Sequence, residues 1–232
     1  MKSIPAMPAA RIIFLLLDGF EAFDLAGPLQ VFYEAQLAGA PYRVSFVASD
    51  PDIETAQALQ VARVEPLSSD VGPSDTIVIP GGTAIRLAVT SRSRKLRPAI
   101  DWIRSGYDAG ARVASVCLGA FFLGAAGLLD GRSATTHWRR VEELRHAFPK
   151  ATVHANRLYV IDGRVASSAG IASGVDLALA LLERDAGPRM AAFVAREMVL
   201  TVRRDGSQEQ LSAFLEGRDH VFAEVHAVQD WL

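Results

Sequence analysis

The single cysteine of the chain, Cys117, lies in a segment typical of a nucleophile elbow. A short β-branched run precedes it, an apolar helical stretch follows it, and the small residues Ser115 and Gly119 stand two positions away on either side. A sharp strand-to-helix turn of this kind lifts its central side chain and tolerates only small neighbours. Because the turn also places the sulfur at a helix N-terminus, we expect a reactive or ligand-sensing thiol with thiolate character. The alternative is a buried cysteine that acts as a small hydrophobic residue.

Asp24 is the candidate acid–base partner of this thiol. It is flanked by the apolar residues Phe23 and Leu25, so its carboxyl is expected to be partly buried. Burial raises the pKa of a carboxyl group, and a protonated Asp24 can donate to the thiolate or transfer a proton. The alternative role of Asp24 is that of an N-cap for the helix that follows, and the two roles are compatible.

The loop Pro80-Gly81-Gly82 follows another apolar run and is the candidate oxyanion or ligand-binding loop. Adjacent glycines allow the backbone to approach a ligand closely. Together with the N–H of Leu118 at the elbow, the N–H of Gly82 is expected to form an oxyanion hole. Taken alone, Pro-Gly-Gly is also compatible with an ordinary turn.

The five histidines indicate no metal site, because none stands at a ligand spacing from a cysteine or carboxylate. His137 is expected either to reach the site or to make a structural hydrogen bond. His146 and the basic residues of segment 92–97 are expected to be solvated. No cofactor is predicted.

The elements that must position these residues alternate along the chain. Apolar or β-branched runs predict strands at 11–17, 42–48, 76–79 and before Cys117, a short ribbon at 61–64, and a hairpin of 158–161 with 164–167 around Asp162-Gly163. Helical spacing predicts helices at 24–38, 94–109, 138–148, 171–183, 189–202 and 220–232. This order predicts an α/β fold with a doubly wound, mainly parallel sheet whose active groups lie at the carboxyl ends of the strands.

Composition restricts the class of protein. The chain has 232 residues, half of them hydrophobic, with a formal net charge of −2, which gives no global field for nucleic acid or an anionic membrane. One cysteine excludes an intramolecular disulfide, and the sequence has no signal peptide or membrane helix, so a cytoplasmic location is expected. We expect a flexible N-terminus at 1–10, a domain at 11–186 and a helical extension or linker at 187–232.

Five motifs occur in order along the chain. They are Asp24-Leu-Ala-Gly-Pro, Ile79-Pro-Gly-Gly, Ser115-Val-Cys-Leu-Gly-Ala, Ala126-Gly-Leu-Leu-Asp-Gly-Arg-Ser-Ala-Thr-Thr-His-Trp and Ser168-Ala-Gly-Ile-Ala-Ser-Gly-Val-Asp. Together they resemble the PfpI/ThiJ superfamily, relatives of class I glutamine amidotransferases with a flavodoxin-like sheet. The fourth motif resembles the branch of isonitrile hydratases and of AraC-type regulators with an amidase-like N-terminal domain. The resemblance adds Ser168 and Gly170 to the candidate site.

The C-terminal part resembles the connection to a DNA-binding module in those regulators. Segment 194–210 is similar to the joining segment, and 220–232 resembles the opening of the first helix of an AraC-type helix-turn-helix domain. The remainder of that domain is absent, so the resemblance implies the sensor half of a regulator. It further implies a homodimer, a small-molecule ligand, and contact with DNA only through the absent domain.

One departure from the family pattern separates two functions. Isonitrile hydratases and many regulators carry threonine directly after the cysteine, protease-like members carry histidine, and this chain has Leu118. A missing polar group that acts in the transition state weakens catalysis. We therefore expect a ligand-sensing, dimerising regulatory domain. The alternative is an isonitrile hydratase or amidase-like enzyme with Cys117 as nucleophile and Asp24 as acid–base; a third, a redox sensor or glyoxal-handling protein, depends on the thiol alone.

Overall fold

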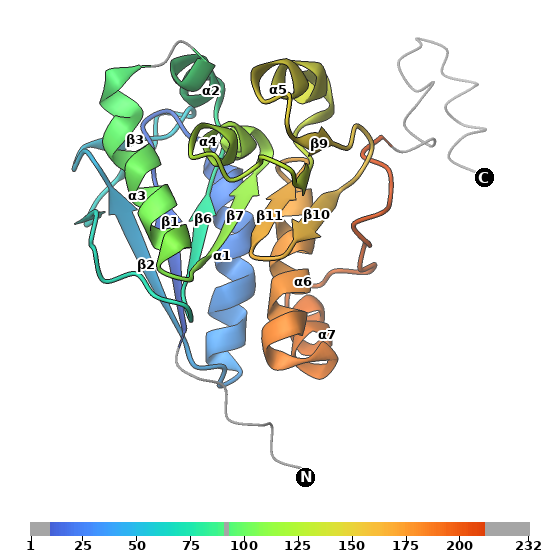
Figure 1. Cartoon of the computed structure of the whole chain (residues 1–232). Coiled ribbons are helices and arrows are strands. Elements are labelled where there is room, and N and C mark those ends of the chain that lie inside the picture. Colours follow the sequence, from blue (N-terminus) through green and yellow to red (C-terminus); the bar gives the residue numbers. More distant parts are fainter. Residues whose placement is uncertain (1–9, 91–92, 212–232) are drawn as a thin grey trace, which may run out of the picture.

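A seven-stranded sheet forms the centre of the protein, as a computed structural model that describes residues 10–90 and 93–211 shows (Figure 1). Its strand order is β10-β11-β7-β6-β1-β2-β5, and all neighbours are parallel except β10 and β11. The strands are β1 (Ala10–Leu15), β2 (Tyr42–Ala48), β5 (Glu65–Pro66), β6 (Thr76–Ile79), β7 (Arg112–Val116), β10 (Tyr159–Asp162) and β11 (Val165–Ser168).

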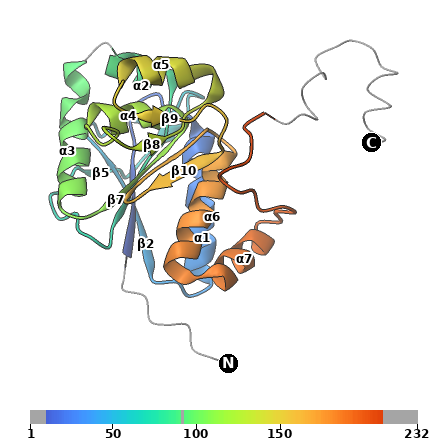
Figure 2. The ribbon, with the colours of Figure 1, turned by 45° about the vertical axis from the view of Figure 1, so that its right-hand side comes forward.

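Helices cover both faces of the sheet (Figure 2). On one face, α1 (Ala22–Leu37), α6 (Ser173–Ala186) and α7 (Pro188–Glu197) pack against one another. The other face carries α3 (Arg97–Asp108) and α4 (Ala120–Ala125), and α2 (Thr83–Thr90) and α5 (Val141–Ala147) pack on α4. The predicted doubly wound α/β fold is confirmed, because helices lie on both sides of a mainly parallel sheet.

The central strands explain why the sheet lies between two helical layers. Within β1 and β6, residues on both faces of the strands are buried, with Phe14, Ile77 and Ile79 fully so. A strand buried on both faces needs a continuous apolar run rather than alternation, which matches the sequences of these strands. Among the described residues, no helix combines the length and apolar character that a bilayer span requires.

Most predicted elements have their expected type, and their boundaries differ at several ends. The strands at 42–48 and 76–79 are confirmed, as is the hairpin, whose turn contains Gly163 with φ +62°. The helix expected from Asp24 begins at Ala22, and the helix expected to reach 202 ends at Glu197. Helix α2 follows the Pro-Gly-Gly loop and was not predicted. The predicted flexible residues 1–9 and the predicted helix at 220–232 lie outside the described residues, whereas residue 10 is part of β1.

The short ribbon expected at 61–64 is present, but it is shorter and begins one residue earlier. Val61 ends the short strand β4 (Gln60–Val61), which pairs with β3 (Ile53–Glu54) as a separate ribbon. The edge of the main sheet is formed instead by Glu65 and Pro66 in β5. Proline cannot donate to a neighbouring strand, so it is accepted only at an edge such as this one, and the apolar pattern carried no signal for it.

After α7 the chain continues as an extended C-terminal strap, residues 199–211, that runs beside β10 (Figures 1 and 2). The N–H of Leu158 donates to the carbonyl oxygen of Gln208 over 3.1 Å. Gly206 is buried against Tyr159, where a Cβ atom would lie 2.6 Å from the Tyr159 carbonyl oxygen. The polar segment that resembled a linker is therefore bound to the body of the protein over its described length.

Candidate functional site

Four neighbouring strands, β11, β7, β6 and β1, end at the same edge of the sheet. The loops after β11, β7 and β6 carry Gly170, Cys117 and Gly81, and the segment after β1 leads to Asp24 in the first turn of α1. The carboxyl ends of parallel strands are where ligands bind in open α/β sheets. The fold therefore brings together residues that are up to 146 positions apart in the sequence.

The backbone at Cys117 has the strained geometry of an elbow. Cys117 has φ +55°, which is uncommon for a residue other than glycine, and it connects β7 to α4. A Cβ atom on Gly119 would lie 2.3 Å from the carbonyl oxygen of Ile79 and 3.3 Å from the Cβ of Ser115. The predicted requirement for small residues two positions from the cysteine is confirmed at both positions by this contact.

Asp24 is fully buried, and one of its two carboxyl oxygens has a hydrogen-bond partner among the described residues. Its Oδ2 accepts a hydrogen bond from the N–H of Gly81 over 3.0 Å, and its Oδ1 has no partner among the described residues. Burial raises the pKa of Asp24 to about 7; the Gly81 hydrogen bond opposes this shift and the charge of Glu21 adds to it. The N-cap alternative is wrong, because the helix begins at Ala22 and Glu21 occupies the cap position.

The thiol of Cys117 is buried, and its pKa is raised. The largest cause is burial, followed by the charge of Asp24, whereas the N–H groups of Leu118 and Ile171 donate to the sulfur and lower the pKa by less. The expected thiolate character is therefore wrong. The predicted helix-start N–H is present at Leu118, but loss of hydration outweighs its effect.

The glycines of the Pro-Gly-Gly loop pack against backbone on both sides. A Cβ atom on Gly81 would lie 2.4 Å from the nitrogen of Leu118, and one on Gly82 would lie 2.4 Å from the carbonyl oxygen of Gly19. The N–H of Gly81 is occupied by Asp24, whereas the N–H of Gly82 makes no hydrogen bond within the described part of the chain. An oxyanion hole of Gly82 and Leu118 stays a prediction.

Gly170 lies between the thiol and an imidazole. A Cβ atom on Gly170 would lie 3.2 Å from Sγ of Cys117 and 3.4 Å from Cδ2 of His137. His137 also accepts a hydrogen bond from the N–H of Arg139 at Nδ1, so it both reaches the site and has a structural role. Burial and the neighbouring arginines lower the pKa of His137, which keeps its imidazole neutral at pH 7.

Ser168 lies between two strands and is not among the residues that border the cavity described next. Its hydroxyl lies 3.4 Å from the carbonyl oxygen of Ser115 and is fully buried between β11 and β7. It joins the strand that leads to Cys117 to the strand that leads to Gly170, which is a positioning contact.

A cavity of about 170 Å³ lies next to Gly170. It is bordered by the loop after β11, the start of α6 and the C-terminal strap, and its lining includes His137, Gly170, Ile171, Ala172, Arg204 and Gln210. Gly170 is one of the residues that line this cavity and Cys117 is not, so the cavity neighbours the elbow through Gly170 without being bordered by the sulfur.

Sequence reasoning missed the groups that connect the strap to the elbow. The hydroxyl of Thr136 donates to the carbonyl oxygen of Cys117 over 2.8 Å. The side-chain amide of Gln210 lies 3.1 Å from the carbonyl oxygen of Thr136 and within 3.2 Å of oxygens of Thr135, Ala155 and Arg157. The Thr-Thr pair stood within a recognised motif and was a usable signal, whereas nothing in the sequence marked Gln210.

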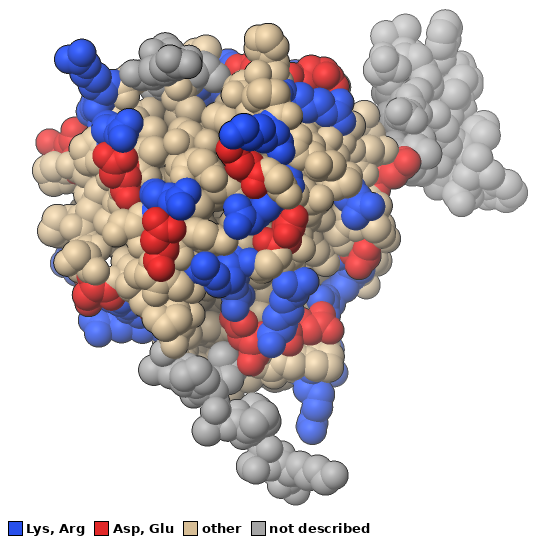
Figure 3. Space-filling model, in the orientation of Figure 1, with Lys and Arg blue, Asp and Glu red and all other residues tan. Residues whose placement is uncertain are grey.

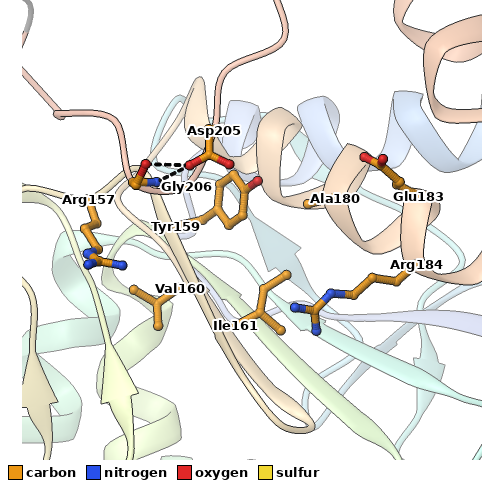
Figure 4. Close-up of a pocket in the computed structure, with 10 residues that line it drawn as sticks. Arg157, Tyr159, Val160, Ile161, Ala180, Glu183, Arg184, Asp205 and Gly206 are labelled. Atoms are coloured by element: carbon orange, nitrogen blue, oxygen red, sulfur yellow. Dashed lines mark hydrogen bonds between the residues drawn. The ribbon is translucent and has the colours of Figure 1, made fainter. Parts of the chain in front are cut away.

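A larger groove of about 580 Å³ lies elsewhere on the protein (Figure 4). Strand β10, helix α6 and the strap form its walls, with Tyr159, Arg184 and Asp205 among the lining residues. None of the groups around Cys117 borders it. In the described ranges, no three histidine, cysteine or carboxylate residues are grouped so as to hold a metal ion.

Comparison with known proteins gives consistent results. The model of the DJ-1/PfpI family matches residues 10–184. The HTH-type transcriptional regulator GbdR of Pseudomonas aeruginosa is 30% identical over 200 residues, which cover 84% of this chain and 52% of the regulator. Isonitrile hydratase of Pseudomonas putida is 31% identical over 192 residues, covering 82% and 78% of the two chains.

A solved structure shows the same fold. The crystal structure of an AraC family transcriptional regulator from Pseudomonas putida superposes with a TM-score of 0.70 at 23% identity, over 82% of this chain and 99% of that chain. The chain spans about half the length of regulators such as GbdR. It is thus similar to the part of these regulators that carries the α/β domain.

Proposed function

Because the chain belongs to the DJ-1/PfpI family and is similar to about half of several HTH-type regulators, we propose that it is the ligand-sensing, dimerising domain of an AraC-type transcriptional regulator. In this function a small metabolite binds in the cavity beside Cys117, and a helix-turn-helix domain outside this chain contacts DNA. The observation that carries the proposal is that one wall of this cavity belongs to the strap.

The chemistry of the pocket supports binding over turnover. Cys117 is buried with a raised pKa, so the neutral thiol predominates at pH 7 and the nucleophilic form is scarce. Leu118 places an apolar side chain directly after the cysteine, where the hydratase-like branch has a polar residue. The protonated thiol can still donate a hydrogen bond to a polar ligand, and Oδ1 of Asp24, which has no partner among the described residues, can hydrogen-bond the ligand as well.

The strap connects the cavity to the backbone of Cys117 through side-chain contacts. Ligand binding shifts a conformational equilibrium only when the ligand has different affinities for the two states. A ligand in the cavity contacts Arg204 and Gln210 of the strap directly, and Gln210 is linked through Thr136 to the backbone of Cys117. Displacement of either strap residue therefore changes the position of the strap, residues 199–211.

The second candidate is an isonitrile hydratase-like enzyme, and the pKa of Asp24 favours it. A carboxyl with a pKa of about 7 is suited to proton transfer at neutral pH. In that reaction the Cys117 sulfur bonds to the isonitrile carbon, while the thiol proton passes through Asp24 to the same carbon. Addition of water and cleavage of the S–C bond then release an N-substituted formamide and restore the thiol.

A thermal-shift screen tests the leading proposal. Small metabolites are added to the wild-type chain, to Ala172→Trp, which fills the cavity from the start of α6, and to Ala192→Trp, a matched control on the exposed side of α7. We expect a ligand that stabilises the wild type and the control but not Ala172→Trp. Equal stabilisation of all three proteins would place binding elsewhere and contradict the proposal.

Turnover distinguishes the two candidates. The chain is incubated with cyclohexyl isonitrile, and formamide is quantified for the wild type and Cys117→Ala. The sensor function predicts no more than one equivalent of product per chain. Many turnovers that are lost in Cys117→Ala would establish the enzyme instead.

A further inference from the structure

Helix α7 and the start of the strap border a groove of about 400 Å³, which we call the arginine groove. It has no lining residue in common with the cavity beside Gly170 or with the groove along β10. Three arginines line it, Arg189, Arg196 and Arg203. No aspartate or glutamate is among the described residues that line it, so the groove is positively charged.

Two of these three arginines have no partner for their charge within the described part of the chain. Nη2 of Arg203 lies 2.6 Å from a carboxylate oxygen of Glu183. Arg189 and Arg196 are exposed, and neither side chain makes an ion pair or a hydrogen bond with another described residue. A guanidinium has five N–H donors and stays charged at any physiological pH. Two such groups in a groove without carboxylates are therefore free to bind an anion.

The spacing of the arginines suits an extended anion. Arg189 and Arg196 are seven residues apart on α7, which places them on the same face of the helix and about 10 Å apart along its axis. Ala192 and Ala195 line the groove between them, so no long side chain separates the two guanidinium groups. Successive phosphates of one DNA strand advance about 3.4 Å along the duplex axis, so about 10 Å corresponds to about three phosphate steps.

We propose that the arginine groove binds the phosphate backbone of duplex DNA, in addition to the contact assigned to the helix-turn-helix domain. The inference goes beyond the proposed function and rests on it only for the nearness of a duplex. Charge favours a polyanion here, because segment 188–204 contains four arginines and one glutamate whereas the complete chain has a formal net charge of −2. Contacts with phosphates add affinity without reading bases, so this groove contributes no sequence specificity.

The salt dependence of DNA binding measures these contacts. Fluorescence anisotropy of a labelled duplex of arbitrary sequence gives the association constant of the wild-type chain at KCl concentrations from about 20 to about 100 mM. The slope of log K against log [KCl] is about −0.9 for each phosphate neutralised, so three arginines predict about −2.7. In the double variant Arg189→Gln/Arg196→Gln we expect a slope of about −0.9 and binding that is about tenfold weaker or more at the lowest salt concentration.

Helix α3 offers a matched control. Arg97 and Arg104 are also seven residues apart on one helix, but α3 covers the opposite face of the sheet from α7. Each of them pairs over 2.9 Å with the aspartate four residues further on. The double variant Arg97→Gln/Arg104→Gln therefore removes the same charge from paired arginines outside the groove, and we expect its slope to equal that of the wild type.

Three results would overturn the inference. They are a wild-type chain that does not bind the duplex at the lowest salt concentration, a slope that the α7 variant leaves unchanged, and an equal change in both double variants. Cosedimentation with vesicles of phosphatidylglycerol and phosphatidylcholine tests another polyanion. Vesicle binding that requires Arg189 and Arg196, without binding of the duplex, would assign the groove to an anionic lipid surface instead. None of these results affects the cavity beside Gly170, so the proposed function is tested separately by the thermal-shift screen.

Discussion

Cys117 and Asp24 are two buried titratable groups, and a negative charge on Asp24 disfavours ionisation of the Cys117 thiol. The negative charge of Asp24 raises the pKa of the thiol, and burial raises the pKa of both. Such a pair holds its protons more tightly than two isolated groups in water. A ligand that accepts a hydrogen bond from the thiol or from protonated Asp24 is thereby favoured.

Asp24→Asn is predicted to make Cys117 more reactive. Asparagine keeps an oxygen for the Gly81 N–H but removes the charge that disfavours the thiolate, so the thiolate fraction at pH 8 rises about tenfold. The measurement is the pH dependence of alkylation by iodoacetamide, with Asp52→Asn as a control of equal charge change. A wild-type rate that is already at its plateau at pH 7 would contradict the account.

Asp24 also predicts a pH dependence of stability. Its pKa is raised from 3.8 to about 7 on folding, so its favourable contribution is full below pH 3.8 and is lost as pH rises through 7. Asp24→Asn should thus stabilise the protein at pH 8 relative to pH 4, by at most about 4 kcal/mol. Urea unfolding of the wild type and the variant at both pH values gives the difference. Equal effects of the substitution at pH 4 and pH 8 would show that Asp24 does not titrate in this range.

The elbow depends on close approach between β6, β7 and the turn at Cys117. A Cβ atom on Gly119 would collide with the carbonyl oxygen of Ile79, and backbone cannot move aside as a side chain does. Any larger residue must therefore separate β6 from the turn and shift the cysteine.

Gly119→Ala is predicted to destabilise the protein by about 3 kcal/mol or more. The control is Gly72→Ala, because a Cβ atom at Gly72 meets nothing closer than 4.0 Å, so its effect should stay within about 1 kcal/mol. Urea unfolding measures both. Similar stabilities of the two variants would mean that the elbow tolerates bulk and that the turn is not tightly packed.

The sequence predicted the elements that local patterns determine. Continuous apolar runs marked the parallel strands, Asp162-Gly163 marked the hairpin, and small residues around Cys117 marked the elbow. The site was predicted only in part. Cys117, Gly170 and His137 meet as the motifs suggested, but burial of the thiol, which reverses its expected ionisation, depends on the packing of the whole sheet.

The contribution of the strap could not be predicted. Gln210 is separated from Thr136 by 74 positions, and a polar, turn-prone segment gives no indication of where it packs. Tertiary contacts of this kind leave no periodic pattern in the sequence, unlike the faces of helices and strands.

At the scale of the whole molecule, the face seen in Figure 3 carries acidic and basic side chains interspersed, with no strongly basic area. The formal net charge is −2. Affinity for DNA depends largely on contacts between basic residues and phosphates, so the face seen in Figure 3 does not favour a stable complex with DNA.

The proposed function predicts that the isolated chain forms homodimers and binds DNA without sequence specificity or not at all. Sedimentation velocity should give about twice the chain mass of 25.0 kDa, and fluorescence anisotropy should show no sequence preference. Specific binding of this chain alone at submicromolar concentration would contradict the sensor assignment, because DNA contact is assigned to a separate domain.

Hydrogen exchange of the strap tests the sensor function most directly. A ligand identified by the thermal-shift screen is added at saturating concentration, and amide exchange is compared with that of the free protein. The account predicts slower exchange in the strap and at Leu158, which donates to Gln208, with no change in the remote strand β2. Unchanged exchange in the strap of the fully liganded protein would show that occupancy of the cavity is not transmitted, and would contradict the proposed function.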